Sequence, residues 1–364
     1  MIKSCDSGSM PPFGDSAKFL EGANSYCSNP KGDSAQYFET VVVESFLDKL
    51  NVNLNVPNYP QFRDMNEMFF SMMNGIQKVD ASYLETEQLS LKSDNNKIAE
   101  VLVLENNAKT VYDQTAKPFE ARVCITGPYT LASFFPYRDD QIFGRLADVL
   151  SKILETNLFS NKCGKTSLVS VDEPLFGLLD DPSIDFGSAG KENLHRAWET
   201  ICKTIRNKGA QTMIHLHNTS NELFWDVDSL QLIDSHVGDP LLSMNKTKQL
   251  LETKDKFLKS SITVNDFDRL IKSSIEQTSQ DLAESEVNQK IADTWTEIKR
   301  GKVNPDLFLD SEDLMKKRLA KTVDQFGEDR VLYAGPECGL KGYPTYKNAL
   351  ECLRRVSSAV KSFQ

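Results

Sequence analysis

The feature that most constrains the fold is an alternation of short β-branched runs with longer stretches of helical periodicity along the chain. Residues 141–159 and 194–209 carry apolar residues at helical spacing, and Gly209 is placed to end the second stretch. Strands separated by helices pair in parallel, and eight such units are the number in a closed (β/α)₈ barrel. The eight candidate strands are residues 3–9, 51–56, 121–127, 167–173, 211–217, 230–234, 257–264 and 331–337.

Two insertions interrupt this alternation. Residues near 75–118 include EVLVLENNAKTVYD, which predicts a hairpin that turns at Asn106-Asn107, between the second and third strands. Residues near 266–330 predict a long, polar and mostly helical insertion before the eighth strand. Since no low-complexity linker or internal repeat divides the chain, we predict one α/β TIM-barrel domain over residues 1–364.

The composition is that of a soluble globular protein, with 40% apolar and 26% charged residues. Its 42 Lys and Arg against 52 Asp and Glu give a net charge of -10, which argues against nucleic acid or an anionic membrane as partner. The N-terminus shows no apolar signal region, and no run approaches eighteen apolar residues. Seven cysteines without a CxxC pair indicate reduced thiols, so we expect a cytoplasmic protein.

Unusual polar residues follow the predicted strands, at the end where barrel enzymes place their chemistry. Side chains two apart on a strand share a face, so His215 and His217 can converge on one point. With Asp234 and Cys338 they offer two imidazoles, a carboxylate and a thiolate, all of which zinc accepts.

Simpler structural roles fit the same residues. A histidine at a strand end is often only hydrogen-bonded, Asp234 suits a helix N-cap, and Cys338 alone would be a small buried apolar residue. The spacing by itself leaves the metal site and these roles open.

The order of the motifs favours the metal site. Between Ser4 and about Tyr343 the chain reads GSMPP, ITGPYTL, VDEP, HLH, ID and GPECGLK, of which the last is the most specific. This order resembles the C-terminal catalytic domain of cobalamin-independent methionine synthase and its single-domain relatives, which are zinc barrels. Nothing in the chain resembles the folate-gripping N-terminal half of the long enzymes. The resemblance implies transfer of a methyl group to the zinc-activated thiol of homocysteine, which forms methionine.

The resemblance also implies the metal ligands. His215 and Cys338 match zinc ligands of the family, and Asp234 stands where its acidic ligand belongs. His217 departs from the pattern because it occupies the position of a cysteine. An imidazole can replace a thiolate on Zn²⁺, but it makes the site one unit more positive.

The same resemblance implies a substrate-binding set. Gly8 and Ser9 would donate hydrogen bonds to the carboxylate of the amino acid, and Asp172 would pair with its ammonium group. We also predict substrate contacts from Glu173, Tyr59 and Gln61 and catalytic roles for Asp172 and His236.

The methyl donor is a further point of departure. The long enzymes carry a glutamate-containing HGE-type motif after the second strand, where this chain has Tyr59-Pro60-Gln61. A YPQ sequence here resembles short, folate-independent methionine synthases, which are thought to use a corrinoid protein. An ordinary turn before a helix is the simpler interpretation of this segment. The resemblance implies a methylated corrinoid or corrinoid protein rather than folate.

Three other functions stay open at this point. One is a zinc-dependent methyltransferase of the same superfamily that acts on another thiol, such as coenzyme M. Another is a metal-free barrel like uroporphyrinogen decarboxylase, although the arginine-rich N-terminal segment of that enzyme is missing. The third is a non-catalytic barrel, which the altered ligand at His217 would suit.

Overall fold

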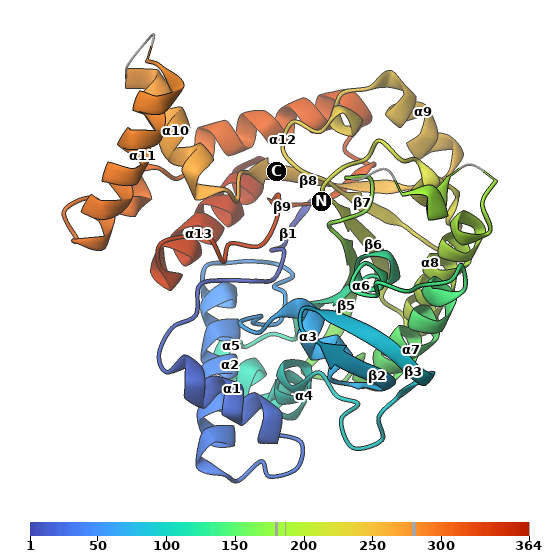
Figure 1. Cartoon of the computed structure of the whole chain (residues 1–364). Helices are drawn as coiled ribbons and strands as arrows, with labels where there is room; N and C mark the ends of the chain where they lie inside the picture. The colour runs from blue at the N-terminus through green and yellow to red at the C-terminus, as the bar shows by residue number, and fades with distance from the viewer. Residues whose placement is uncertain (179–180, 186, 279–281, 364) are drawn as a thin grey trace.

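The core of the protein is a curved sheet of parallel strands with helices around its outside (Figure 1). The computed structural model describes residues 1–363 except 179–180, 186 and 279–281. Within these residues the sheet has seven strands in the order β1-β9-β8-β7-β6-β5-β4, and every neighbouring pair is parallel. They are β1 (Lys3–Ser4), β4 (Phe119–Thr126), β5 (Gly164–Glu173), β6 (Gln211–Leu216), β7 (Leu232–Asp234), β8 (Phe257–Thr263) and β9 (Val331–Pro336).

Three strands of the sheet are buried on both faces. In β4, β6 and β8 every residue after the second is buried, whichever side its side chain takes. Continuous burial of this kind is typical of parallel strands with helices on the outer face and side chains filling the inner one. The predicted α/β class, with parallel strands joined through helices, is confirmed.

The prediction of a strand at residues 51–56 was wrong. Helix α2 (Asp33–Asn51) extends to the start of this range, and the chain then continues without a regular ladder. Pro57 and Pro60 follow directly, and proline has no backbone N–H to donate to a neighbouring strand.

This irregular segment still joins the two edges of the sheet. Single parallel bridges link Val56 to Cys5, beyond β1, and Asn58 to Arg122 in β4. A buried ion pair supports the junction, because Lys49 Nζ lies 2.8 Å from Asp6 Oδ2 while Asp6 Oδ1 accepts from Asn58 N at 2.6 Å. The segment therefore occupies the place of the missing strand.

The two helices expected from periodicity are present. Helix α7 (Ile142–Asn157) and helix α8 (Ala189–Asn207) pack side by side against the sheet. Gly209 follows α8 with a φ of 80°, a left-handed conformation that glycine adopts without strain. The other helices of the barrel are α1 (Ser16–Ser25), α3 (Met65–Phe70), α6 (Pro128–Ala132), α9 (Asn245–Thr253) and α13 (Tyr346–Phe363).

The hairpin insertion is present, but the predicted position of its turn was wrong. Asn106-Asn107 lies at the junction of two helices, α4 (Ala99–Asn106) and α5 (Ala108–Thr115). The hairpin comes earlier, as the antiparallel pair β2 (Met73–Val79) and β3 (Ser82–Leu91). The run VLVL misled the prediction, because a short apolar stretch buried almost all round has no periodicity that separates strand from helix.

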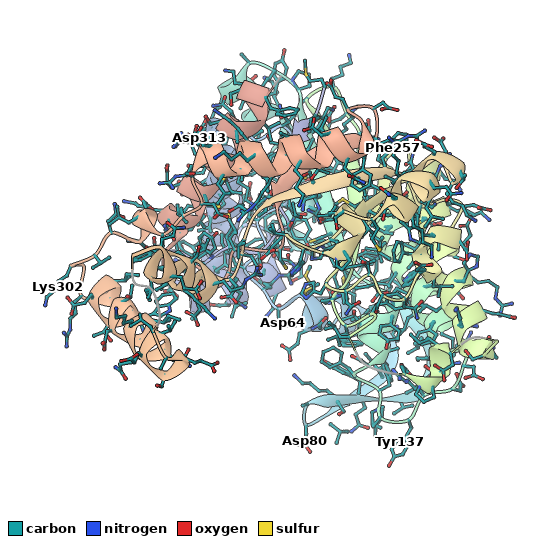
Figure 2. The ribbon with its side chains drawn as sticks, turned by 90° about the horizontal axis from the view of Figure 1, so that it is seen from above. Asp64, Asp80, Tyr137, Phe257, Lys302 and Asp313 are labelled. Atoms are coloured by element: carbon teal, nitrogen blue, oxygen red, sulfur yellow. The ribbon has the colours of Figure 1, made fainter. Side chains whose placement is uncertain are left out.

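The predicted helical insertion is confirmed. It consists of α10 (Phe267–Thr278), α11 (Glu284–Lys299) and α12 (Glu312–Phe326), of which α12 packs on β8. The α10–α11 pair projects from the barrel (Figure 1). Figure 2 shows Lys302, just after α11, and Asp80, at the turn of the β2–β3 hairpin, at the periphery of the molecule. None of the helices in the described part of the chain combines the length and apolar character needed to cross a bilayer.

We predict that Asp6→Ala lowers the free energy of unfolding by about 3–5 kcal/mol, because it leaves the Lys49 ammonium buried without its partner. Urea denaturation of both proteins measures the change. Asp113→Ala is the control, because the Lys109–Asp113 pair is exposed. Water solvates the Lys109 ammonium group once the carboxylate is removed, so the substitution should change stability little. Equal effects of the two substitutions would contradict the role given to the Asp6–Lys49 pair.

Candidate metal centre and active site

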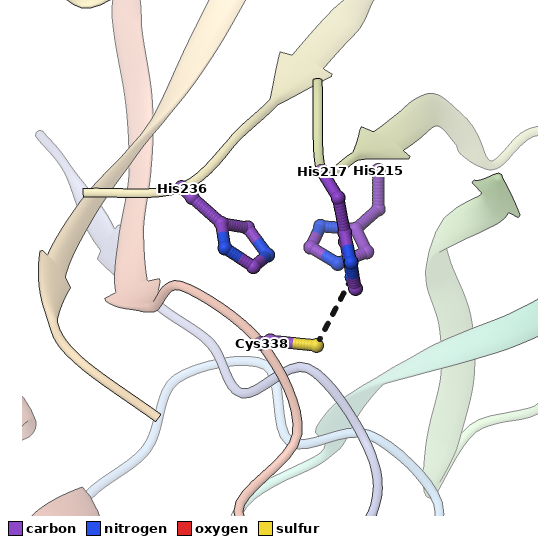
Figure 3. A group of neighbouring side chains, drawn as sticks. All are labelled: His215, His217, His236 and Cys338. Carbon is purple, nitrogen blue, oxygen red and sulfur yellow. Dashed lines mark hydrogen bonds between the residues drawn. The ribbon is translucent and has the colours of Figure 1, made fainter. Parts of the chain in front are cut away.

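Four side chains that could bind a metal converge at the carboxyl ends of three strands. His215 and His217 come from the end of β6, His236 follows β7, and Cys338 follows β9. Their ligand atoms all lie within 4.8 Å of one another. Figure 3 shows the four side chains gathered in one group. Because neighbouring parallel strands end at the same rim, residues up to 123 positions apart, from His215 to Cys338, meet there.

The spacing of the group fits a small metal ion. The Sγ atom of Cys338 lies 3.6 Å from Nε2 of His217, and the rings of His217 and His236 have centroids 4.3 Å apart. A tetrahedral zinc site, with Zn–N of about 2.0 Å and Zn–S of about 2.3 Å, places a nitrogen and a sulfur ligand roughly 3.5 Å apart. The separation between Cys338 Sγ and His217 Nε2 matches this geometry.

Two of the imidazoles have buried nitrogens that a metal would satisfy. Nε2 of His215 and Nε2 of His236 have no hydrogen-bond partner among the described residues. Buried polar atoms are nearly always paired, with protein, water or an ion. Three imidazoles and a thiolate are also donors that zinc prefers, so the residues fit the metal that the resemblance implies.

Asp234 does not belong to this group, although the sequence predicted it as a ligand. Its carboxylate is fully buried, with Oδ2 at 3.0 Å from His215 Nδ1 and Oδ1 at 2.7 Å from Lys259 Nζ. With both oxygens engaged, Asp234 lies behind His215 rather than facing the other ligand atoms, and His236 takes its place in the group. A carboxylate on the far nitrogen of a metal-binding histidine is a common support, which fixes the tautomer and the ring orientation.

The charges of the cluster favour a thiolate. Burial alone would raise the pKa of the Cys338 thiol, but the imidazoles of His215, His217 and His236 hold it well below its usual range. Burial alone would lower the pKa of His215, but the Asp234 carboxylate raises it to about 10. Burial would raise the pKa of Asp234 as well, and the Lys259 ammonium holds it far below its usual range.

Asp172 lies next to this cluster. It is paired in the sheet register with His215, and its Oδ1 accepts from Ser170 Oγ at 2.6 Å. Burial raises the pKa of Asp172, against the effect of the Arg122 guanidinium, whose Nη2 lies 3.7 Å from Oδ1. Its position at the rim suits the predicted contact with an ammonium group.

Glu173, the other predicted substrate contact of this strand, makes its hydrogen bonds within the protein. Its oxygens accept from Tyr129 N at 2.9 Å, Thr130 N at 2.7 Å and Trp198 Nε1 at 2.8 Å. The fully buried carboxylate thus caps the first turn of α6 and ties it to α8. Gly127 allows this approach, because a Cβ atom there would lie 2.2 Å from Cδ of Glu173.

The predicted carboxylate-binding loop lies beside the cysteine. Leu340 N donates to Ser9 O at 2.7 Å, and a Cβ atom on Gly339 would lie 2.2 Å from Ser9 Oγ. Gly8 has a φ of 108°, and a side chain there would meet Oε1 of Gln61 at 2.6 Å. The structure therefore brings Gly8, Ser9 and Gln61 together near Cys338.

Tyr59 is placed differently from the other predicted substrate contacts. It is fully buried, and its hydroxyl donates to Cys124 O at 3.2 Å. Since its only polar atom beyond the backbone is engaged inside the barrel, the structure gives no support to the predicted substrate contact.

Two clefts open on the metal-binding group. One, of about 600 Å³, is lined by His217, His236 and the loops that follow β6 and β7. The other, of about 520 Å³, extends from His236 to Phe267, Arg269 and Trp295 of the α10–α11 pair. His236 lines both clefts, so molecules can approach it from two sides.

Sequence reasoning missed two residues of this region. Lys259 is a lone charged residue in the predicted strand 257–264, and such a residue signals a buried ion pair. Glu337 stands in the most specific motif, directly before Cys338, but received no role.

The chain is similar in sequence to part of two homocysteine methyltransferases. No family model matches the chain. Both relatives are named 5-methyltetrahydropteroyltriglutamate–homocysteine methyltransferase. The one from Streptomyces coelicolor is 24% identical to this chain over 256 residues, and the one from Streptomyces griseus is 25% identical over 231 residues. These matches cover 63% and 56% of this chain, and 31% and 28% of the relatives, so the chain matches about a third of their length.

A solved structure shares the fold over the whole chain. The B12-independent methionine synthase from Shewanella sp. W3-18-1, bound to selenomethionine, superposes with a TM-score of 0.59 at 12% identity, covering 100% of this chain and 97% of that one. This chain resembles methionine synthases. The resemblance predicted from the motif order is thereby confirmed, and the shared fold supports the barrel architecture.

We predict about one equivalent of tightly bound zinc in the purified protein, which elemental analysis measures. Cys338→Ser should lower the zinc content strongly, since it removes the thiolate from the group. Cys163→Ser is the control, because Cys163 is another partly buried free thiol that lies outside this group. Full zinc content in the Cys338→Ser protein would show that the ligand assignment is wrong.

Proposed function

We propose that the protein is a zinc-dependent methyltransferase that converts homocysteine to methionine. The main support for the proposal is the convergence of four side chains at the rim of the barrel, whose fold is similar to that of a methionine synthase. The four are His215, His217, His236 and Cys338. Homocysteine is proposed as the methyl acceptor because the curated relatives are named as homocysteine methyltransferases.

The four side chains would hold the ion, and the ion would keep the thiol of homocysteine deprotonated at neutral pH. Asp234 orients His215 through Nδ1, which leaves Nε2 free to face the group. Lys259 holds Asp234 in turn, from a fully buried position. The chain thus fixes its first imidazole through two further residues.

The charge of this ligand set affects the reactivity of the thiol. Three neutral imidazoles and one thiolate would cancel only half of the charge of a bound Zn²⁺, so a substrate thiolate would bring the net charge of the centre to zero. A thiolate in a neutral centre is held more tightly and is less nucleophilic than one in a centre with excess negative charge. Such a centre would therefore need a donor from which the methyl group leaves easily.

A methylated corrinoid meets this requirement. A methyl group on a tertiary amine is a poor electrophile, whereas a methyl group on cobalt(III) is displaced far more readily. The Tyr59-Pro60-Gln61 sequence supports the same donor by resemblance to folate-independent enzymes. The curated relatives are named for a folate donor, but the chain matches only about a third of their length.

The proposed amino-acid site lies around Asp172, Gly8 and Ser9. The Asp172 carboxylate, next to His215, would pair with the substrate ammonium group, and the loop at Gly8 and Ser9 would receive the carboxylate. A partly dehydrated rim strengthens both charge-assisted contacts.

We also propose a single domain in the cytoplasm. All seven cysteines of the chain are free thiols in the structure, which supports a reducing compartment.

We predict that Asp172→Asn weakens homocysteine binding by about 2–5 kcal/mol, since it removes the charged partner of the ammonium group. Zinc content should stay unchanged, because Asp172 lies outside the metal-binding group. Asp181→Asn is the control, since Asp181 is also paired with an arginine, Arg138, but lies elsewhere. Calorimetric titration measures the affinity, and equal binding by Asp172→Asn and wild type would mean that the amino group is held elsewhere.

We predict slow methionine formation from homocysteine and free methylcobalamin, and faster formation when a methylated corrinoid protein is the donor. Methyltetrahydrofolate should give almost none, because its methyl group needs a stronger nucleophile. The assay offers each donor to the same enzyme and measures methionine. Turnover with the folate alone would refute the corrinoid donor, and no turnover with any donor would refute the methyltransferase proposal.

A further inference from the structure

We propose that Glu337 is a positioning residue, which fixes the separation of His236 and Cys338 in the metal centre. The proposal rests on the metal site of the proposed function and assigns a role to a residue outside its ligand set.

The Glu337 carboxylate connects three strand ends. It is fully buried at the end of β9, where its Oε2 accepts from Val237 N at 2.9 Å and its Oε1 from Asn265 N at 3.0 Å. Val237 follows His236 directly, and Glu337 itself precedes Cys338. One side chain therefore ties the backbone beside one ligand to the backbone beside another.

The hydrogen bonds of Glu337 affect the position of His236 more than that of the other ligands. Strand β7 ends at Asp234, so His236 lies on a loop beyond the last ladder pair, between the two clefts. His215, by contrast, lies within β6 and is held by Asp234. Since zinc requires ligand atoms at fixed distances, the hydrogen bond from Val237 N to Glu337 determines how well His236 meets Cys338.

The barrel contains a comparable buried carboxylate without such a connection, although it lacks the ion pair that Glu337 Oε1 makes with Arg269 Nη1 at 3.5 Å. Glu173 is also fully buried at a strand end and also accepts two backbone N–H groups, from Tyr129 and Thr130. Neither of those residues is next to a member of the metal-binding group. Glu173→Gln therefore reproduces the loss of a buried carboxylate at the rim without disturbing the ligands.

The experiment compares Glu337→Gln with Glu173→Gln. An amide at position 337 offers one acceptor oxygen to two N–H groups, so one of the two bonds is lost. Zinc affinity, measured by competition with a chromophoric chelator, should fall about ten- to a hundred-fold in Glu337→Gln and stay close to wild type in Glu173→Gln.

A second measurement needs no metal. In metal-free protein labelled with ¹⁵N-histidine, the imidazole signals of His236 should move in Glu337→Gln and keep their positions in Glu173→Gln. If Glu337→Gln fails to fold, Glu337→Asp replaces it, because aspartate keeps the charge and both oxygens but is one methylene shorter.

Wild-type zinc affinity in Glu337→Gln, or equal losses in both variants, would overturn the positioning role. A wild-type protein that binds no zinc would refute the proposed metal site instead. In that case the histidine spectra would still test the inference, and unmoved His236 signals in the Glu337 variant would overturn it.

Discussion

The rim of the barrel depends on one buried carboxylate, that of Asp234, which lies between the His215 imidazole and the Lys259 ammonium. The three residues are direct partners in the parallel register of β6, β7 and β8, so the sheet itself brings them side by side. Burying these charges is costly in isolation, and the pairing offsets that cost. Because the same carboxylate engages Nδ1 of His215, the packing of the barrel interior also fixes the imidazole that faces the metal-binding group.

The sequence predicted correctly the parts of the fold in which apolar residues recur at regular spacing and turn residues mark the ends of an element. Helices α7 and α8 and the parallel strands from β4 to β9 follow patterns that only one arrangement buries well. The segment after α2 was misjudged because Pro57 and Pro60 outweigh its apolar alternation. The run before Asn106 was misjudged because a helix buried on most sides looks like a strand over eight residues.

The candidate site was predictable to the same degree. His215, His217 and Cys338 could be placed together because each follows a parallel strand, and such strands end at one rim. The exchange of Asp234 for His236 could not be foreseen, since it depends on Lys259 and His215 having already engaged both oxygens of Asp234. Contacts between side chains determine whether Asp234 or His236 faces the site. These contacts cannot be inferred from the spacing of the residues along the chain.

We propose that three imidazoles and one thiolate hold the metal, with Asp234 behind them. X-ray absorption at the zinc edge of the loaded protein tests it most directly. We expect one sulfur at about 2.3 Å and three imidazole nitrogens at about 2.0 Å, and the loss of one imidazole in His236→Ala. A spectrum with two imidazoles and a carboxylate oxygen beside the sulfur, unchanged in His236→Ala, would contradict it.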